Sequence, residues 1–196
     1  MLKNGSLEHR FGQIILASAS PRRAQILSQI GFHFKTVPSA VEEIVTNHDP
    51  VEVAKELALK KAAEIAESYP DQIVIGADTV VFINHKILGK PSTEEDAQEM
   101  LRLLSGKTHV VYTAFAIVHK QKRKKVVDIE STEVTFRNIA EEDIIRYVNS
   151  GDPMDKAGAY GIQDQSAVFI KSIRGDFYNV VGLPVSKIYS CLQEQF

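Results

Sequence analysis

Two hydroxyls and two guanidinium groups follow a short apolar segment and could together bind phosphate. The sequence Ser18-Ala-Ser20-Pro21-Arg22-Arg23 comes directly after Gln13-Ile-Ile-Leu-Ala17. Ser20 is a favourable N-cap and Pro21 suits a first helical turn, so a helix is predicted to begin here. Free N–H groups at a helix start, together with serine hydroxyls and arginines, suit a phosphate. On the local sequence alone, a capped helix with two solvated arginines is an equal alternative.

A carboxylate interrupts the most apolar segment of the chain. Residues 73–83 are apolar except at Asp78 and Thr79, which is typical of a strand buried on both faces. A buried carboxylate is costly unless it is paired or coordinates a metal. Asp78 is therefore a candidate metal ligand, a base for water, or both, and the alternative is a structural carboxylate paired with backbone donors or a lysine.

Glu42 and Glu43 offer further oxygen ligands nearby in the sequence. Mg²⁺ or Mn²⁺ would suit such a site, because hard cations prefer carboxylate and phosphate oxygens. Two glutamates in a loop are also typical of a solvated surface.

A third set of polar residues is spread along the chain. It comprises Lys61, Lys90 in Gly89-Lys90-Pro91, and Lys156 with Gln163 in a glycine-rich segment. Each lysine alone is typical of a surface charge. Glycines, however, let a backbone approach a ligand closely, and an amide there could read the polar edge of a base.

Several other motifs are incomplete. Ser105-Gly-Lys-Thr108 resembles the end of a P-loop, but the first glycine of that motif would fall at Leu101. The six histidines show no pair at zinc-ligand spacing, and there is no Gly-x-Ser-x-Gly sequence. The basic segment 120–125 contains no aromatic residue that could stack on bases. The one cysteine, Cys191, forms no disulfide within the chain and is interpreted as a small apolar side chain on a terminal helix.

The elements that must position these residues alternate between strands and helices. We predict that residues 1–12 are an irregular polar extension and that residues 13–196 form one domain. The pattern predicts an α/β fold with a mixed, twisted central sheet flanked by helices in two lobes. Strands are predicted at 13–17, 32–37, 73–83, 110–119, 126–136 and 167–173, and helices at 21–30, 50–69, 94–104, 141–149 and 184–193, with an irregular segment at 152–165.

Composition narrows the class of protein. The chain has 196 residues, of which 44% are hydrophobic, and a formal net charge of -2. That charge argues against stable nucleic-acid binding but not against a small anion held by local cations. The N-terminus lacks the apolar region of a secretory signal, and no apolar run could span a bilayer, so we expect a cytoplasmic protein that binds no membrane.

The motifs taken together resemble the Maf family. The resemblance extends from about Gln13 onward in the same order. It rests on Leu16-Ala-Ser-Ala-Ser-Pro-Arg-Arg23, Gly76-Ala-Asp-Thr-Val-Val81, Gly89-Lys-Pro91, Leu104-Ser-Gly-Lys-Thr-His109, Asp155-Lys-Ala-Gly-Ala-Tyr-Gly-Ile-Gln163 and Asn179-Val-Val-Gly-Leu-Pro184.

This resemblance implies a nucleoside triphosphate pyrophosphatase that uses a divalent cation and has a fold similar to inosine triphosphatases. Asp78 would be catalytic and would bind the metal with Glu43. The phosphate site would be lined by Ser18, Arg23, Glu43, Lys61 and Lys90, to which the local sequence adds Ser20 and Lys156.

The resemblance also implies a choice of base and of partners. Arg22, Thr79 and Gln163 resemble the subgroup that acts on dTTP and UTP, whereas a subgroup preferring 7-methyl-GTP has a tryptophan at position 22. Modified pyrimidine nucleotides are an open alternative, as are ITP and XTP. A non-catalytic nucleotide-binding regulator of septum formation is another, because the family is linked to cell-division arrest. A homodimer and a cell-division protein partner rest on resemblance alone.

Overall fold

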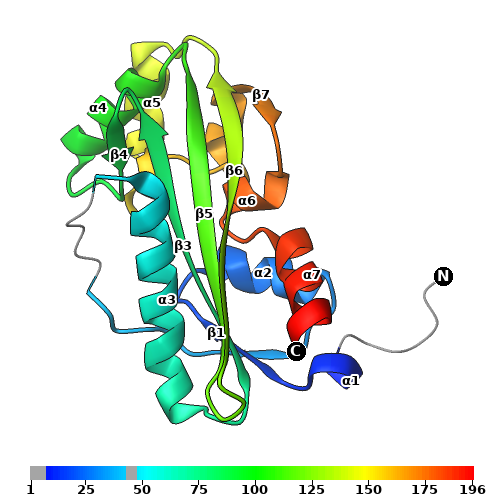
Figure 1. The fold of residues 1–196 in the computed structure, drawn as a ribbon. Coiled ribbons are helices and arrows are strands. Elements are labelled where there is room, and N and C mark those ends of the chain that lie inside the picture. Colours follow the sequence, from blue (N-terminus) through cyan, green and yellow to red (C-terminus); the bar gives the residue numbers. More distant parts are fainter. Residues whose placement is uncertain (1–7, 43–47) are drawn as a thin grey trace, which may run out of the picture.

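A seven-stranded sheet forms the centre of the molecule (Figure 1). The computed structural model describes residues 8–42 and 48–196. The strand order is β2-β1-β3-β5-β6-β7, with β4 paired to β3, and only the β1–β2 and β1–β3 pairs are parallel. The predicted mixed sheet is therefore confirmed. Its strands are β1 (Ile14–Ala17), β2 (Phe34–Thr36), β3 (Ile73–Ile83), β4 (Lys86–Leu88), β5 (Thr108–His119), β6 (Lys124–Phe136) and β7 (Ile170–Arg174).

Helices cover both faces of this sheet. The helices are α1 (Glu8–Phe11), α2 (Pro21–Gln29), α3 (Pro50–Ser68), α4 (Glu94–Leu104), α5 (Glu141–Val148), α6 (Phe177–Val181) and α7 (Val185–Gln195). Three 3₁₀ segments, Asp152–Asp155, Ala157–Ala159 and Gln165–Phe169, follow α5. On one face, α3 packs against alternate residues of β3 and β5 such as Val74 and Ala114.

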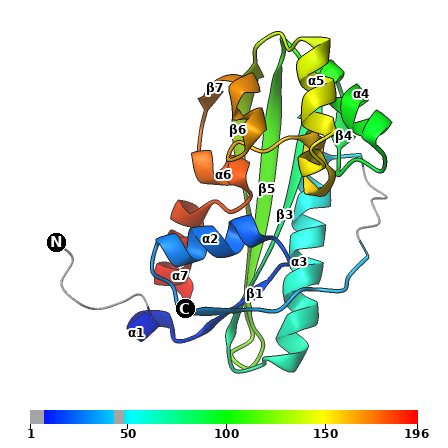
Figure 2. The ribbon, with the colours of Figure 1, turned by 180° about the vertical axis from the view of Figure 1, so that it is seen from behind.

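The opposite face carries two separate groups of helices (Figure 2). Helices α2 and α7 enclose one apolar cluster, which includes Ile75 and Phe115 of the sheet. Helices α4 and α5 enclose a second cluster around Val81 and Val111. The chain thus builds two lobes on one continuous sheet, as the sequence predicts.

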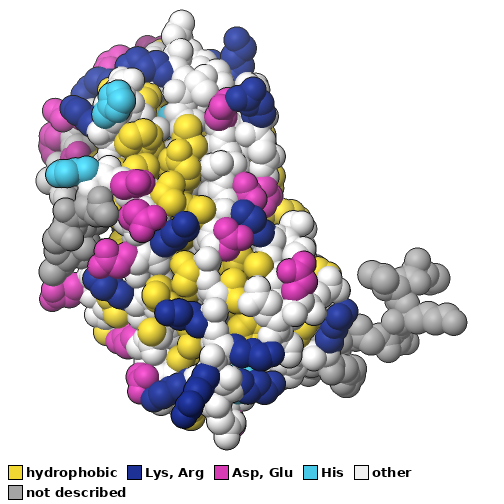
Figure 3. All heavy atoms as spheres, in the orientation of Figure 1, with side chains coloured by type: hydrophobic (Ala, Val, Ile, Leu, Met, Phe, Trp, Pro, Cys, Tyr) yellow, Lys and Arg dark blue, Asp and Glu magenta, His cyan; other side chains and the backbone are white. Residues whose placement is uncertain are grey.

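Local sequence signals explain most element boundaries. Asp49 caps α3 by accepting a hydrogen bond from the Val51 N–H, and Thr93 caps α4 through the Asp96 N–H. The β5–β6 hairpin has the predicted basic tip, and dark blue spheres gather at that end of the molecule in Figure 3. In the described part of the chain, no helix is both long and apolar enough to cross a membrane.

Some element predictions were wrong or incomplete. The strand expected from residue 167 begins only at Ile170, because Asp164 caps a 3₁₀ turn through the Ser166 N–H. Part of the N-terminal extension is helical (α1), and its Phe11 ring packs against Phe32. The short elements β4 and α6 were not predicted. Helix α6 is followed by a C-cap at Gly182, whose φ of 114° suits glycine.

Candidate active site

A cleft of about 770 Å³ gathers the residues that the sequence singled out. It opens between the start of α2, the middle of β3, α3 and the 3₁₀ segments that follow α5. That volume is within the usual range for a small-molecule site. Ten of the predicted site residues line the cleft: Ser18, Ser20, Arg22, Arg23, Lys61, Asp78, Thr79, Lys90, Lys156 and Gln163. Glu42, the alternative acidic ligand, is exposed and does not line it. Glu43 lies outside the described residues.

Asp78 forms a buried ion pair at the base of this cleft. The Lys61 Nζ donates to the Asp78 Oδ1 at 2.6 Å, and the two residues are only 8% and 6% exposed. Asp78 was interpreted either as a functional carboxylate or as a structural one paired with a lysine. Both features are present, because the buried carboxylate has a lysine partner and also faces a ligand-sized cleft. Breaking a buried ion pair of this kind by removing one partner is destabilising.

Gly76 sets the distance between the elements that carry this pair. A Cβ atom built at Gly76 would lie 2.6 Å from the Ala58 carbonyl oxygen and 2.7 Å from the Ala62 backbone nitrogen. Residues two apart on a strand share a face, so Gly76 and Asp78 both point toward α3. The missing side chain therefore lets α3 lie directly on β3, where Lys61 reaches the carboxylate.

Arg23 is bound to the protein on all sides of its guanidinium group. Its Nε donates to the Gly182 carbonyl at 2.7 Å, and one terminal nitrogen donates to the Ala77 carbonyl at 2.9 Å and the Ser18 Oγ at 3.2 Å. The other terminal nitrogen donates to the Thr79 Oγ1 at 3.1 Å. The alternative of a solvated arginine is therefore wrong at this position. Arg23 connects α2, β3 and the end of α6 while its positive charge lines the cleft.

A buried polar network supports Thr79 from behind. Its hydroxyl is 2.9 Å from that of Thr113 on β5, which donates to the Asn179 carbonyl at 2.8 Å. The Asn179 side chain accepts from the Thr113 N–H and donates to the Val111 carbonyl and the Thr132 hydroxyl. Because Asn179 and Thr113 are fully buried and hydrogen-bonded, the network fixes the orientation of Thr79.

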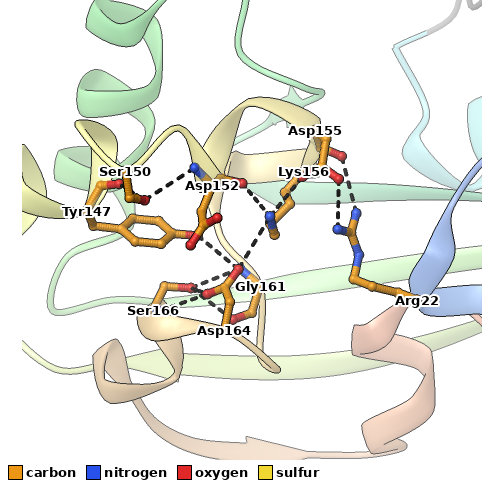
Figure 4. Close-up of polar contacts among 9 residues, drawn as sticks. All are labelled: Arg22, Tyr147, Ser150, Asp152, Asp155, Lys156, Gly161, Asp164 and Ser166. Carbon is orange, nitrogen blue, oxygen red and sulfur yellow. Dashed lines mark hydrogen bonds and ion pairs between the residues drawn. The ribbon is translucent and has the colours of Figure 1, made fainter. Parts of the chain in front are cut away.

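Arg22 meets Asp155 across the cleft (Figure 4). One of its terminal nitrogens donates to the Asp155 Oδ2 at 2.9 Å and the other to the Asp155 carbonyl at 3.3 Å. The Lys156 Nζ donates to the Asp155 Oδ1 at 2.8 Å. Partial burial alone would raise the pKa of the Asp155 carboxyl, but the hydrogen bonds and charges of Lys156 and Arg22 lower it below its ordinary value.

Two serines line the cleft where β1 leads into α2. Ser18 is buried, and its Oγ accepts from the Ser20 N–H at 3.2 Å. Ser20 occupies the N-cap position, but its side chain makes no capping hydrogen bond. The Ser20 hydroxyl is thus not committed to the helix, while Lys90 and Gln163 are exposed at the cleft surface.

A histidine–tyrosine pair lies beneath the cleft. The His109 Nε2 is 2.7 Å from the Tyr160 hydroxyl, and both residues are at least 95% buried. Burial lowers the pKa of His109 to about 4 and raises the pKa of Tyr160, so both side chains are neutral at pH 7. Tyr160 immediately precedes Gly161 and lines the cleft, so this pair supports the glycine-rich segment.

Within the described part of the chain, the donor set suits a divalent cation that a bound ligand also holds. Among residues 8–42 and 48–196, no group of three or more His, Cys, Asp or Glu side chains could hold a metal. Asp78 provides one carboxylate. Mg²⁺ is commonly held by one or two carboxylates plus substrate phosphates, so the site fits an ion shared with a bound nucleotide.

Sequence reasoning missed the acidic partners of the site. Asp155 stood within a quoted motif, yet nothing in its spacing marked it as a contact of Arg22, 133 residues away. Asp164, which is 3.4 Å from the Lys156 Nζ, lay in a segment predicted to be irregular. Asn179 also belonged to a quoted motif, and an amide among apolar residues was the available signal.

Comparisons with known proteins give a matching family model and several similar proteins. A family model described as Maf-like protein matches residues 13–195. A dTTP/UTP pyrophosphatase of Bacillus cereus (strain G9842) is 49% identical over 183 residues, covering 93% of this chain and 95% of that protein. A dTTP/UTP pyrophosphatase of Agathobacter rectalis is 49% identical over 198 residues, covering 93% of this chain and 97% of that protein.

Two solved structures share the fold. A HAM1 protein from Coxiella burnetii has a TM-score of 0.51 at 18% identity and covers 93% of this chain and 98% of its own. The Staphylococcus aureus Ham1 protein has a TM-score of 0.53 at 15% identity, with 92% and 98% covered. At these identities the likeness concerns the fold alone.

Proposed function

This chain belongs to the Maf family, and on that basis we propose that it hydrolyses dTTP and UTP between the α and β phosphates, releasing pyrophosphate. The observation that carries the proposal is the buried Asp78–Lys61 pair at the base of a cation-lined cleft. Relatives covering almost all of this chain and bearing the name dTTP/UTP pyrophosphatase support the substrate class.

The charge of the cleft suits a triphosphate. Its described lining includes five cationic side chains and two carboxylates, Asp78 and Asp155, which leaves a formal charge of +3. The cations are Arg22, Arg23, Lys61, Lys90 and Lys156. Such preorganised cations stabilise the charge that develops during phosphoryl chemistry.

Asp78 is the residue we assign to the chemistry. Lys61 holds its carboxylate at a fixed position, from which Asp78 orients a water toward the α-phosphorus and accepts its proton. Pyrophosphate then leaves, with its negative charge offset by the lysines and arginines of the cleft. Mg²⁺ or Mn²⁺, held by Asp78, the bound phosphates and, by family resemblance, Glu43, would supply further charge stabilisation.

Base choice is assigned to three other residues that line the cleft, Gln163, Thr79 and Arg22. Gln163 is exposed at the cleft surface, and its amide can both donate to and accept from the edge of a pyrimidine. Together with Gln163, Thr79 and Arg22 resemble the residues of the subgroup that acts on dTTP and UTP. Modified pyrimidine nucleotides belong to the same proposal as candidate substrates.

A nucleotide panel tests the proposal. Purified protein with Mg²⁺ or Mn²⁺ should release pyrophosphate from dTTP and UTP faster than from CTP, GTP, ITP or XTP. Preference for ITP or XTP would refute the pyrimidine assignment, and orthophosphate as the first product would refute cleavage between the α and β phosphates. Binding without turnover would favour a non-catalytic regulator.

A variant at Asp78 tests the role assigned to its carboxylate. Asp78→Asn should retain nucleotide binding and reduce kcat by at least about 10²-fold, because general acid–base catalysis typically contributes 10²- to 10⁴-fold. A wild-type rate in that variant would remove Asp78 from the chemistry.

The same family resemblance extends the proposal beyond catalysis. We propose one domain over residues 13–196, a homodimer, a cytoplasmic location and a link to cell division. Light scattering on the purified chain tests the dimer. Comparing the division phenotype of wild type and Asp78→Asn tests whether hydrolysis carries the link.

A further inference from the structure

Asp155 lies between two cations that line the cleft, and the proposed mechanism gives it no role. Its Oδ2 accepts from Arg22 and its Oδ1 accepts from Lys156, so one carboxylate connects the start of α2 to the 3₁₀ segment beside the cleft (Figure 4). The Arg22 and Asp155 side chains come from the two sides of the cleft mouth, 133 residues apart in sequence.

The contact fixes the guanidinium of Arg22 at two points. Besides the bond to the carboxylate, its other terminal nitrogen donates to the Asp155 main-chain carbonyl at 3.3 Å. A guanidinium has five N–H donors, and these two contacts leave others for a ligand in the cleft that Arg22 lines. Asp155 therefore restrains Arg22 without exhausting its capacity to bind.

Asp155 is itself held by a more deeply buried anchor. The Lys156 side chain is 10% exposed and contacts the Asp152 carbonyl and the Asp164 carboxylate as well as Asp155. The Asp164 carboxylate accepts from the Tyr147 hydroxyl at 3.1 Å and from the Ser166 N–H at 2.8 Å. Because Lys156 is held by these contacts, it can keep the more exposed Asp155 carboxylate in place, and Asp155 can in turn restrain Arg22.

We propose that Asp155 is a positioning residue that holds Arg22 in place for the nucleotide. This inference rests on the proposed function and extends it to a residue outside the predicted site. A fixed guanidinium loses less conformational entropy on binding than a free one, so Asp155 lowers the cost of nucleotide binding. Its effect therefore falls on KM and on affinity, while kcat depends on Asp78.

A double-mutant cycle tests this coupling. The variants are Asp155→Asn, Arg22→Gln and the double variant, with Asp155→Glu as the conservative rescue. Asp143→Asn is the matched control, because its carboxylate pairs with Arg146 on α5, on the surface. KM and kcat for dTTP are measured with Mg²⁺, and the affinity for an α,β-imido analogue of dTTP is measured by calorimetry.

We expect Asp155→Asn to raise KM and to weaken analogue binding by about fivefold, the upper range for a partly exposed ion pair. We expect kcat to stay within about twofold, since the lost interaction is present before and during the reaction. In the Arg22→Gln background, Asp155→Asn should have no effect on KM or on affinity. In the wild-type background, Asp155→Glu should keep KM and affinity closer to the wild-type values than Asp155→Asn does. Asp143→Asn should match the wild type.

Three outcomes would overturn the inference. A lower KM in Asp155→Asn would show that the carboxylate competes with the nucleotide for Arg22. An unchanged KM, or an equal rise in the Arg22→Gln background, would show that Asp155 does not act through Arg22. Failure of wild type to release pyrophosphate from dTTP and UTP would instead refute the proposed function, and the binding cycle with the analogue would still decide the role of Asp155.

Discussion

Replacing Gly76 with alanine would insert a methyl group where β3 and α3 nearly touch. The added Cβ would lie 2.6 Å from the Ala58 carbonyl oxygen, whereas ordinary contact begins at 3.4 Å. Both neighbouring atoms at Ala58 and Ala62 belong to the helix backbone, which cannot rotate away as a flexible side chain would. Helix α3 must therefore move from the sheet by about 0.8 Å, the difference between those two distances.

That displacement would reach the ion pair of the candidate active site. If α3 moves as a rigid body, the Lys61 Nζ to Asp78 Oδ1 distance grows from 2.6 Å to about 3.4 Å, beyond a normal hydrogen bond. Overpacking of this kind costs about 1–3 kcal/mol of unfolding free energy. For a chain of this length, a loss of about 2 kcal/mol lowers Tm by about 4–8 °C. A misplacement of about 1 Å near a reacting group can reduce the rate by roughly 10²-fold.

Thermal unfolding and dTTP turnover measured on Gly76→Ala test both consequences. Gly89→Ala is the control for stability, because a Cβ there meets no atom within 4 Å. A Tm equal to that of the wild type would refute the close approach of α3 and β3. A lowered Tm with unchanged kcat would show that the position of α3 does not control Asp78.

Two further predictions concern Arg23 and His109. Arg23→Lys should reduce unfolding free energy by about 1–3 kcal/mol, because a lysine cannot replace donors directed at two backbone carbonyls. The matched change Arg22→Lys should alter it by less than about 0.5 kcal/mol, and equal losses in urea unfolding would contradict these separate roles. Because burial lowers the pKa of His109 to about 4, the unfolded chain binds more protons between pH 4 and 6.5, so stability falls as the pH drops below 6.5. His109→Gln should remove about 2 kcal/mol of the loss between pH 6.5 and 5, and an unchanged pH profile of urea unfolding would assign that loss to other groups.

Local patterns in the sequence were sufficient to predict the long elements. The apolar run 73–83 and the capped helix 94–104 have the same bounds in the structure as in the prediction. Their signals are local, since a strand buried on both faces and a capped amphipathic helix both show in short windows. The 3₁₀ segment before Ile170 was missed because Val168 and Phe169 are β-formers, and only the Asp164 cap reveals the turn.

The contacts within the cleft were harder to predict from the sequence than the helices and strands. Charge and polarity marked the residues that line it, because each stood where an apolar core pattern does not place it. Their partners depend on tertiary packing: the Lys61–Asp78 pair requires α3 to lie on β3, and the Arg22–Asp155 contact requires both lobes. Neither contact can be inferred from the spacing of its two residues along the chain.

Arg22 and Arg23 show why the same side chain at adjacent positions has different roles. Successive residues of an α-helix point about 100° apart, so the two neighbouring side chains leave the helix in different directions. Arg23 turns toward the sheet and donates to the Ala77 and Gly182 carbonyls, whereas Arg22 turns toward the cleft mouth and Asp155. Arg23 consequently fixes the walls of the cleft, including Thr79, before any nucleotide arrives. Arg22 keeps donors for the nucleotide, and its position depends on the partner across the cleft. The motif Ser-Pro-Arg-Arg therefore combines a scaffold residue and a ligand-binding residue, and the direction of each side chain from the helix separates the two.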